Sequence, residues 1–113
     1  MNQFEDELKN GKFVCSECPK CNKLVWPPYD FCNVCFGSVI WRQVSRSGKL
    51  IEFSKKDDTL FCIAEFENSI RIMGELEIGL MRPMLGEELE LVRCDYDGKE
   101  KFFFQLKQNS SNM

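Results

Sequence analysis

Histidine is absent from the 113-residue sequence. The chain therefore lacks the commonest general base, the commonest metal-binding nitrogen and every Ser-His or Cys-His catalytic pair. The sequence also has no N-terminal apolar stretch typical of a signal peptide, and no apolar run near the roughly 18 residues of a membrane-spanning helix. We therefore expect a cytoplasmic protein that does not depend on histidine chemistry and does not cross a membrane.

The apolar content is sufficient for a modest core. Hydrophobic residues make up 43% of the chain and include ten Phe, which is too many for a disordered protein. The formal charge of -3, from 15 basic and 18 acidic residues, opposes polyanion binding over the whole surface but allows a local basic patch. A chain this short buries a limited share of its surface, so a metal ion would help it to fold.

Four of the seven cysteines stand in two C-x2-C pairs, Cys18–Cys21 and Cys32–Cys35, separated by ten residues. Each pair can place two sulfurs about 2.3 Å from one ion, and two pairs complete a tetrahedron. Paired cysteines in a chain without export signals are typical of metal ligands rather than disulfides. Because four protein ligands leave no position for water or substrate, we predict one structural Zn²⁺, held by Cys18, Cys21, Cys32 and Cys35. Rubredoxin-like iron is the chemical alternative.

The backbone after the second cysteine of such a pair usually turns through positive φ, which favours Gly or Asn. Asn22 fits this preference after the first pair. The second pair is followed by Phe36 and only then by Gly37, which fits less well. The two turns around the ion are therefore not equally well explained by the sequence.

Three cysteines lie outside the two pairs. Cys15 extends the first pair to C-x2-C-x2-C, like the start of an iron–sulfur run, but the fourth ligand of that run would fall on Val25. Cys15 is then a spare thiol or a substitute ligand. Cys62 and Cys94 lie on predicted strands, where we expect them to be small buried apolar residues.

The first residues predict a short helix. Asn2 can cap its start, with Glu5 in the capping-box position, and Gly11 can end it. Phe4 and Leu8 share one face. A helix this short is marginally stable alone and needs packing contacts, either with its own domain or with a partner molecule.

Beyond residue 43 the sequence changes to short strands bounded by turn residues. The run from Ile70 to Ile78 alternates strictly between apolar and polar residues. Asn68-Ser69 and Asp97-Gly98 are typical of tight hairpin turns, and Gly74 inside a strand indicates a bulge or a sharp bend. The predicted strands are 49–54, 60–67, 70–78, 88–94 and 101–107.

Five short strands with turn signals predict a small curved barrel of the OB type. The stretch 79–86 interrupts the meander and is expected to be a helix or an irregular connection. The predicted fold is mostly β: a short N-terminal helix, a rubredoxin-like zinc ribbon and a five-stranded OB-fold barrel. The expected boundaries are 1–11 for the helix, 12–43 for the ribbon, 44–108 for the barrel and 109–113 for a polar tail.

The loop between the two cysteine pairs carries a dense apolar run, Trp26, Pro27, Pro28, Tyr29 and Phe31. Aromatic residues are enriched at the cores of protein interfaces, so this loop either binds a partner or packs on the barrel. Basic residues in this half of the chain could meet the phosphates of coenzyme A or form an ordinary solvated surface. They are Lys20, Lys23, Arg42, Arg46 and Lys49.

Several motifs in this order resemble one known family. They are the N-terminal helix ending in Gly11-Lys12, the two cysteine pairs around Pro27-Pro28, Trp41, the segment Ser47–Ser54, then Arg71–Gly74 and Gly86–Leu91. In this combination the chain resembles the acyl-CoA-associated OB-fold proteins with an N-terminal rubredoxin-like zinc ribbon, long catalogued as a domain of unknown function. Within that family it is most similar to the archaeal scaffold of the acetoacetyl-CoA thiolase/HMG-CoA synthase complex.

This resemblance implies a non-catalytic scaffold or accessory subunit of an acyl-CoA-metabolising complex. Its partners would be thiolase-fold enzymes such as acetoacetyl-CoA thiolase and HMG-CoA synthase of the mevalonate pathway, and CoA or acyl-CoA is a candidate ligand in a shared pantetheine channel. The resemblance implies no catalytic residue and names no CoA-binding residue.

Two other function classes stay open at this stage. An OB barrel with a zinc ribbon could bind single-stranded nucleic acid. The strand 70–78 offers Arg71 beside Glu75 and Glu77, and the segment 87–90 is acidic, so an interleaved basic and aromatic surface is not evident. An enzyme or a rubredoxin-like electron carrier is the third class, and iron in the purified protein would favour the carrier.

Overall fold

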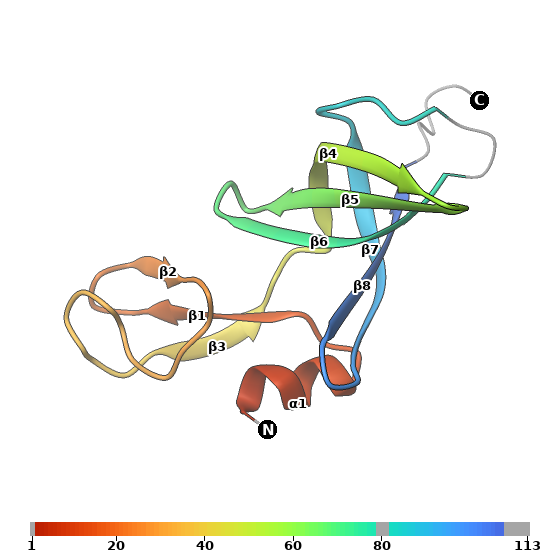
Figure 1. Cartoon of the computed structure of the whole chain (residues 1–113). Helices are drawn as coiled ribbons and strands as arrows, with labels where there is room; N and C mark the ends of the chain where they lie inside the picture. Colours follow the sequence, from red (N-terminus) through yellow and green to blue (C-terminus); the bar gives the residue numbers. More distant parts are fainter. Residues whose placement is uncertain (1, 79–81, 108–113) are drawn as a thin grey trace. The chain divides into compact units, whose positions relative to one another are not determined.

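The computed structural model describes residues 2–78 and 82–107 (Figure 1). The predicted tail 109–113 and part of the predicted connection 79–86 lie outside this range. The mostly β fold is confirmed, with one short helix, a three-stranded sheet that carries the paired cysteines, and a closed five-stranded barrel. The elements are α1 (Gln3–Lys9), β1 (Val14–Cys18), β2 (Lys23–Val25), β3 (Ile40–Gln43), β4 (Ser47–Lys56), β5 (Thr59–Phe66), β6 (Ile70–Glu77), β7 (Glu88–Tyr96) and β8 (Glu100–Leu106).

The chain divides into two compact units. The first contains the described residues up to Val44 together with Cys94–Glu100, which form the tip of the β7–β8 hairpin. The second contains Ser45–Arg93 and the described residues from Lys101 onward. The paired cysteines therefore belong to the first unit and the barrel to the second.

Helix α1 has the capping predicted from the sequence. The Asn2 side chain accepts from the Glu5 backbone N–H at 2.8 Å, and the Glu5 side chain accepts from the Asn2 N–H at 3.2 Å. Gly11 has φ +80°. The backbone N–H groups of Gly11 and Lys12 donate hydrogen bonds to carbonyls of the last helical turn. Phe4 and Leu8 are buried. The apolar face of the helix thus packs within its own domain, one of the two expected alternatives.

Removing the cap should loosen this helix. Asn2→Ala deletes the acceptor for an N–H at the helix start, and we expect a loss of about 1 kcal/mol in the free energy of unfolding. Chemical denaturation measures it. Asn2→Asp keeps an acceptor at the same place and should stay close to the parent protein. Equal stability of Asn2→Ala and Asn2→Asp would show that the cap contributes nothing.

In the first unit, β1 is the central strand of a three-stranded antiparallel sheet with the order β2-β1-β3. Ser16 of β1 pairs with Val25 on one side and with Trp41 on the other. The strand ends at Cys18, so the first cysteine pair begins where the sheet stops. This sheet thereby fixes the start of the first cysteine turn.

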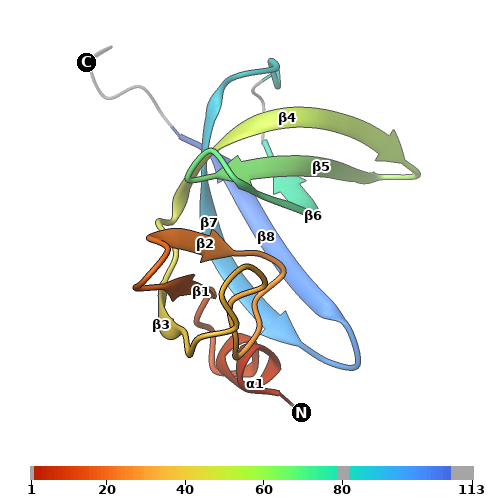
Figure 2. The same ribbon diagram turned by 90° about the vertical axis from the view of Figure 1, so that its left-hand side faces the viewer.

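In the second unit, the barrel order is β4-β5-β6-β8-β7, with β4 returning to β7 (Figure 2). Consecutive strands β4, β5 and β6 pair antiparallel, whereas β6 and β8 pair parallel through Glu75–Phe103 and its neighbours. The interior is aliphatic and aromatic. Its members include Leu50, Cys62, Ala64, Phe66, Ile70, Ile72, Leu76, Leu89, Leu91, Phe102, Phe104 and Leu106.

The strict alternation read from the sequence is confirmed in β6, where Ile70, Ile72 and Leu76 are buried. The hairpin before it turns one residue earlier than predicted, because Glu67 and Asn68, rather than Asn68 and Ser69, have positive φ. The turn at Asp97-Gly98 lies where it was predicted, with Gly98 at φ +73°. Of the expected irregular connection, residues 82–86 are described and form no helix.

Gly74 does not mark a bulge, which was one of the two alternatives predicted for it. The β5–β6 register continues through Cys62–Gly74 without a shift, and the irregularity lies in β4 between Leu50 and Glu52. Gly74 is needed for a different reason. A Cβ there would lie 2.4 Å from the Phe102 carbonyl oxygen and 2.6 Å from the Phe104 ring. The glycine allows β8 to approach β6 closely where the barrel closes.

Candidate metal centre and the exposed loop around it

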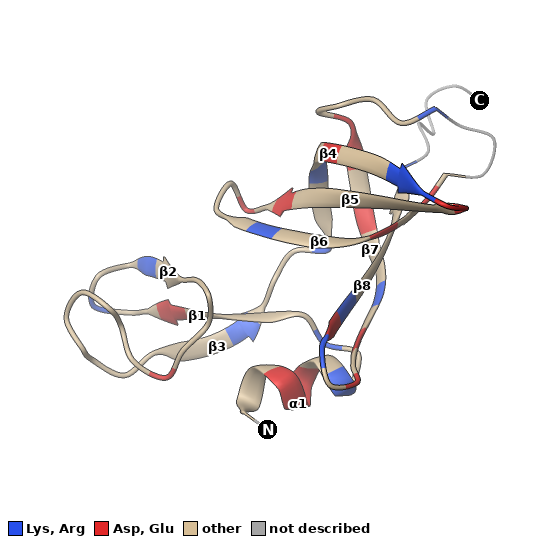
Figure 3. Ribbon diagram, viewed as in Figure 1, with Lys and Arg blue, Asp and Glu red and all other residues tan. Residues whose placement is uncertain are grey.

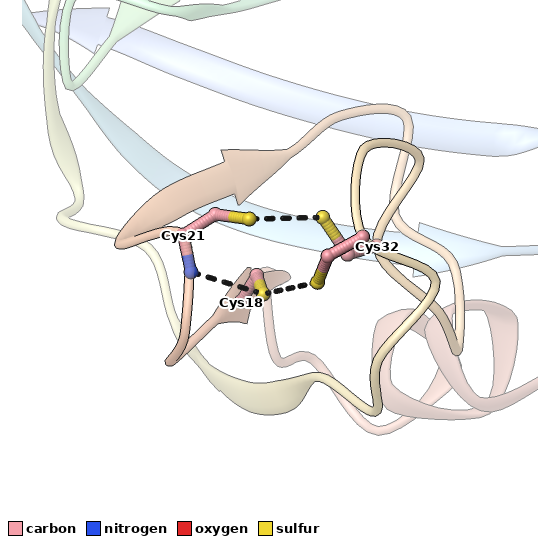
Figure 4. A group of neighbouring side chains, drawn as sticks. Cys18, Cys21 and Cys32 are labelled. Carbon is pink, nitrogen blue, oxygen red and sulfur yellow. Dashed lines mark hydrogen bonds between the residues drawn. The ribbon is translucent and has the colours of Figure 1, made fainter.

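Two backbone turns bring the four paired cysteines together. The Sγ atoms of Cys18, Cys21, Cys32 and Cys35 all lie within 4.8 Å of one another. Figure 4 shows Cys18, Cys21 and Cys32 converging from the end of β1 and from the following loops. Cys18 and Cys32 are buried, Cys21 is half-buried and Cys35 is exposed, so the cluster lies at the surface of its unit.

The sulfur spacing fits one tetrahedral ion. Four thiolates at about 2.3 Å from zinc stand about 3.8 Å apart. The Cys18 and Cys35 sulfurs are 3.5 Å apart, and the Cys21 and Cys32 sulfurs are 3.9 Å apart. The four side chains are therefore compatible with a single metal ion, and with all positions filled by protein that ion would be structural.

Backbone N–H groups surround the sulfurs, as is common for metal-bound thiolates. The Cys21 N–H donates to Cys18 Sγ at 3.4 Å, and the Gly37 N–H donates to Cys35 Sγ at 3.4 Å. Backbone N–H groups of Cys35 and Val34 lower the pKa of the Cys32 thiol. The neighbouring Cys35 thiol, with burial, raises the pKa of Cys21. The clustered thiols cannot all ionise alone, and a bound cation would remove that conflict.

The two turns have the same backbone geometry. The N–H of the residue after each pair donates to the carbonyl of its first cysteine, Asn22 to Cys18 at 2.8 Å and Phe36 to Cys32 at 3.0 Å. Asn22 has φ +56° and Phe36 has φ +60°. The positive φ expected after each pair is thus present in both turns. In the second turn it falls on Phe36 itself, so the less favourable residue occupies the left-handed position.

The other cysteines do not join this cluster. Cys15 is fully buried on β1, three residues before Cys18, so in the extended strand the two side chains point to opposite faces. Cys15 is thus not placed as a substitute ligand. Cys62 and Cys94 are buried, as expected, and burial raises the pKa of the Cys62 thiol to about 11. A thiol with that pKa stays protonated near neutral pH and is a poor nucleophile.

The aromatic loop between the pairs divides into a packed part and an exposed part. Trp26 makes edge contacts with Phe4 and Phe13, at centroid distances of 5.6 and 6.0 Å, so it packs half-buried against the core of the first unit. Tyr29 and Phe31 contact each other and are exposed. These two ring contacts of Trp26 are thus with α1 and Phe13 rather than with the barrel, and binding of a partner by the exposed part of the loop stays a prediction.

A buried serine, which the sequence gave no reason to single out, holds this loop. The Ser16 hydroxyl donates to the Val25 carbonyl at 3.3 Å and accepts from the Tyr29 N–H at 3.1 Å. Ser16 is fully buried, so these bonds are formed away from water and fix the path of the chain. The strand Val14–Cys18 holds two neighbouring polar residues, Ser16 and Glu17, so the pattern of the strand did not mark Ser16 as the buried one.

The five basic residues proposed to meet CoA phosphates fall in both units. Arg42 forms an ion pair with Glu17 at 3.0 Å, and Arg46 donates to the Leu91 carbonyl at 3.2 Å. Lys20, Lys23 and Lys49 are exposed. Two of the five are therefore already engaged in contacts within the chain.

None of the helices in residues 2–78 and 82–107 has the length and apolar character needed to span a bilayer.

No protein-family model matches the sequence, and no curated protein matches it either. Among solved structures, the fold is similar to a chain of the Ltp2-ChsH2(DUF35) aldolase, with a TM-score of 0.74 and 16% identity over 94% of this chain and 96% of that one.

A second similar structure is a DUF35-family protein of unknown function from Sulfolobus solfataricus. Its TM-score is 0.62 and its identity 14%, over 93% of this chain and 83% of that chain. At these identities the likeness establishes the fold. The helix, cysteine-bearing sheet and barrel of this chain thus have a fold similar to that of these two structures.

Proposed function

We propose that the chain is a non-catalytic accessory subunit of an acyl-CoA-metabolising enzyme complex. The observation that carries the proposal is the likeness, over nearly the full length of both chains, to a chain of the Ltp2-ChsH2(DUF35) aldolase. The sequence motifs independently resemble acyl-CoA-associated proteins of this architecture. In its finer form, the proposal is that the chain bridges acetoacetyl-CoA thiolase and HMG-CoA synthase and helps to form a shared pantetheine channel.

The chemistry of the chain is consistent with a scaffold. The four clustered cysteines would fill every position around a zinc ion, which therefore stabilises structure and activates no water. The sequence supplies no histidine, and the buried Cys62 thiol is held protonated. A bridging subunit needs no base or nucleophile of its own. It needs exposed apolar surface, and the loop around the metal cluster provides it.

Affinity purification of the tagged, full-length chain from its native host tests this proposal. We expect an acyl-CoA enzyme, in the finer form a thiolase or a synthase, to be retained in stoichiometric amount and identified by mass spectrometry. Recovery of single-stranded nucleic acid without such an enzyme, with an affinity that falls steeply with salt, would instead support the nucleic-acid alternative.

The isolated chain should not turn over a thioester. We expect the purified, zinc-loaded protein to leave acetyl-CoA and acetoacetyl-CoA unchanged, because the proposed role assigns it no reacting group. Release of free CoA, followed with a thiol reagent, measures this after correction for the thiols of the protein. Turnover at a rate above the uncatalysed background would contradict the non-catalytic part of the proposal.

A further inference from the structure

Phe36 combines two unfavourable properties. Its φ of +60° lies in the left-handed region, where a bulky side chain is sterically disfavoured. Its side chain is also 77% exposed, so the ring gains little from packing within the chain. A residue that is strained and also exposed to water does little for the stability of its own fold.

The first cysteine turn shows what the fold itself requires at this position. Asn22 occupies the equivalent place after Cys21, with nearly the same φ and the same backbone hydrogen bond to the first cysteine of its pair. Asparagine tolerates the left-handed region. The backbone of the second turn therefore needs no aromatic ring, and the presence of Phe36 calls for a reason outside the turn.

The segment around Phe36 is apolar and uncharged. No charged residue occurs between Asp30 and Arg42. Figure 3 shows this loop without basic or acidic colouring. Interface cores are depleted in charge and enriched in aromatic residues, whereas a surface for nucleic acid requires cations. The exposed large apolar residues of the segment are Phe31, Val34, Phe36 and Ile40, with Tyr29 just before it.

We propose that Phe36 is the anchor of a docking surface for the partner enzyme, and that the partner offers an apolar socket to receive its ring. This inference rests on the proposed function for the identity of the partner. A second copy of the chain is a poorer occupant in one respect: a pocket of its barrel unit is lined by polar and charged residues and would not suit an apolar ring. The lining residues include Ser45, Ser47, Lys49, Glu65, Glu67 and Glu88.

The test compares Phe36→Asn with the parent chain and with Met73→Asn, all full-length and zinc-loaded. Asn22 shows that asparagine suits the turn, so Phe36→Asn should keep its zinc and should raise the unfolding midpoint by roughly 3–6 °C. Met73 is 64% exposed on β6 and serves as the matched control. In captures from the native host, Phe36→Asn should bind the acyl-CoA enzyme at least about tenfold more weakly, while Met73→Asn should bind like the parent.

The outcomes separate the two proposals. If Phe36→Asn is folded and retains the enzyme as well as the parent does, the docking inference is wrong and the proposed function stands. If the parent retains no acyl-CoA enzyme, both are wrong. A lower unfolding midpoint for Phe36→Asn would also overturn the inference, because it would show that the ring supports its own turn. Equal losses for Phe36→Asn and Met73→Asn would mean that no anchor exists at this loop.

Discussion

A Cys18→Ser, Cys35→Ser double variant is expected to lose its metal ion, the order of the cysteine-bearing sheet, and with them its association with a partner. The two sulfurs lie 3.5 Å apart and come from different turns, so the change removes one ligand from each. Structural zinc contributes roughly 10–16 kcal/mol to the folding of small zinc domains at neutral pH. The strands of this sheet have only five, three and four residues, so little apolar packing could replace that contribution.

Metal analysis of the purified protein and amide exchange of β1–β3 measure this effect. Cys15→Ser is the matched control. It changes a buried thiol on the same strand as Cys18 but outside the sulfur cluster, and should keep a full equivalent of zinc. A double variant with protected β1–β3 amides and no metal would show that the ion is dispensable. Loss of zinc from Cys15→Ser would reassign the ligand set.

Gly74→Ala is expected to destabilise the barrel severely while leaving the metal cluster loaded. The added Cβ would lie 2.4 Å from the Phe102 carbonyl oxygen and 2.9 Å from the Phe102 carbonyl carbon, distances that no real Cβ sustains. Because these atoms belong to the backbone of β8, a side-chain rotation cannot relieve the contact. The parallel β6–β8 pairing that closes the barrel must then open. We expect a loss of about 3 kcal/mol or more, at the upper end of measured overpacking effects.

Chemical denaturation combined with metal analysis tests this expectation. Gly86→Ala is the comparison, since Gly86 has φ +85° but no atom within 4 Å of the added Cβ. Gly86→Ala therefore measures only the free-energy cost of placing an alanine at positive φ, roughly 1 kcal/mol. If both variants lost the same free energy, the close approach of β8 would not be the reason for Gly74.

Local patterns in the sequence predicted the elements that depend on local physics. Alternation identified β6 because only one face of that strand is buried. The cap at Asn2 and the turn at Gly98 follow from side-chain hydrogen bonding and from the freedom of glycine. The spacing of the paired cysteines indicated one ion, and the four sulfurs do converge. Such features involve residues only a few positions apart, or a motif that already encodes the geometry.

Features set by distant residues could not be predicted in the same way. The role of Gly74 depends on Phe102, which lies 28 positions later and pairs through a crossover that local patterns do not reveal. Which part of the aromatic loop is packed and which part is exposed depends on which of its rings contact Phe4 and Phe13. The positive φ of Phe36 was expected from its place directly after Cys35, although its residue type does not favour that conformation. The backbone places the turn directly after Cys35 whatever residue stands there.

The membership of Cys94–Glu100 in the first unit affects the order in which the protein can mature during synthesis. All four metal ligands leave the ribosome before Cys94, since the last of them is Cys35. The unit that holds them is completed only when Cys94, which is buried, and the tip of the final hairpin have been translated. A nascent chain could therefore capture its ion before the unit that holds the four ligands is complete. The N-terminal 44 residues alone would lack the segment that completes their unit.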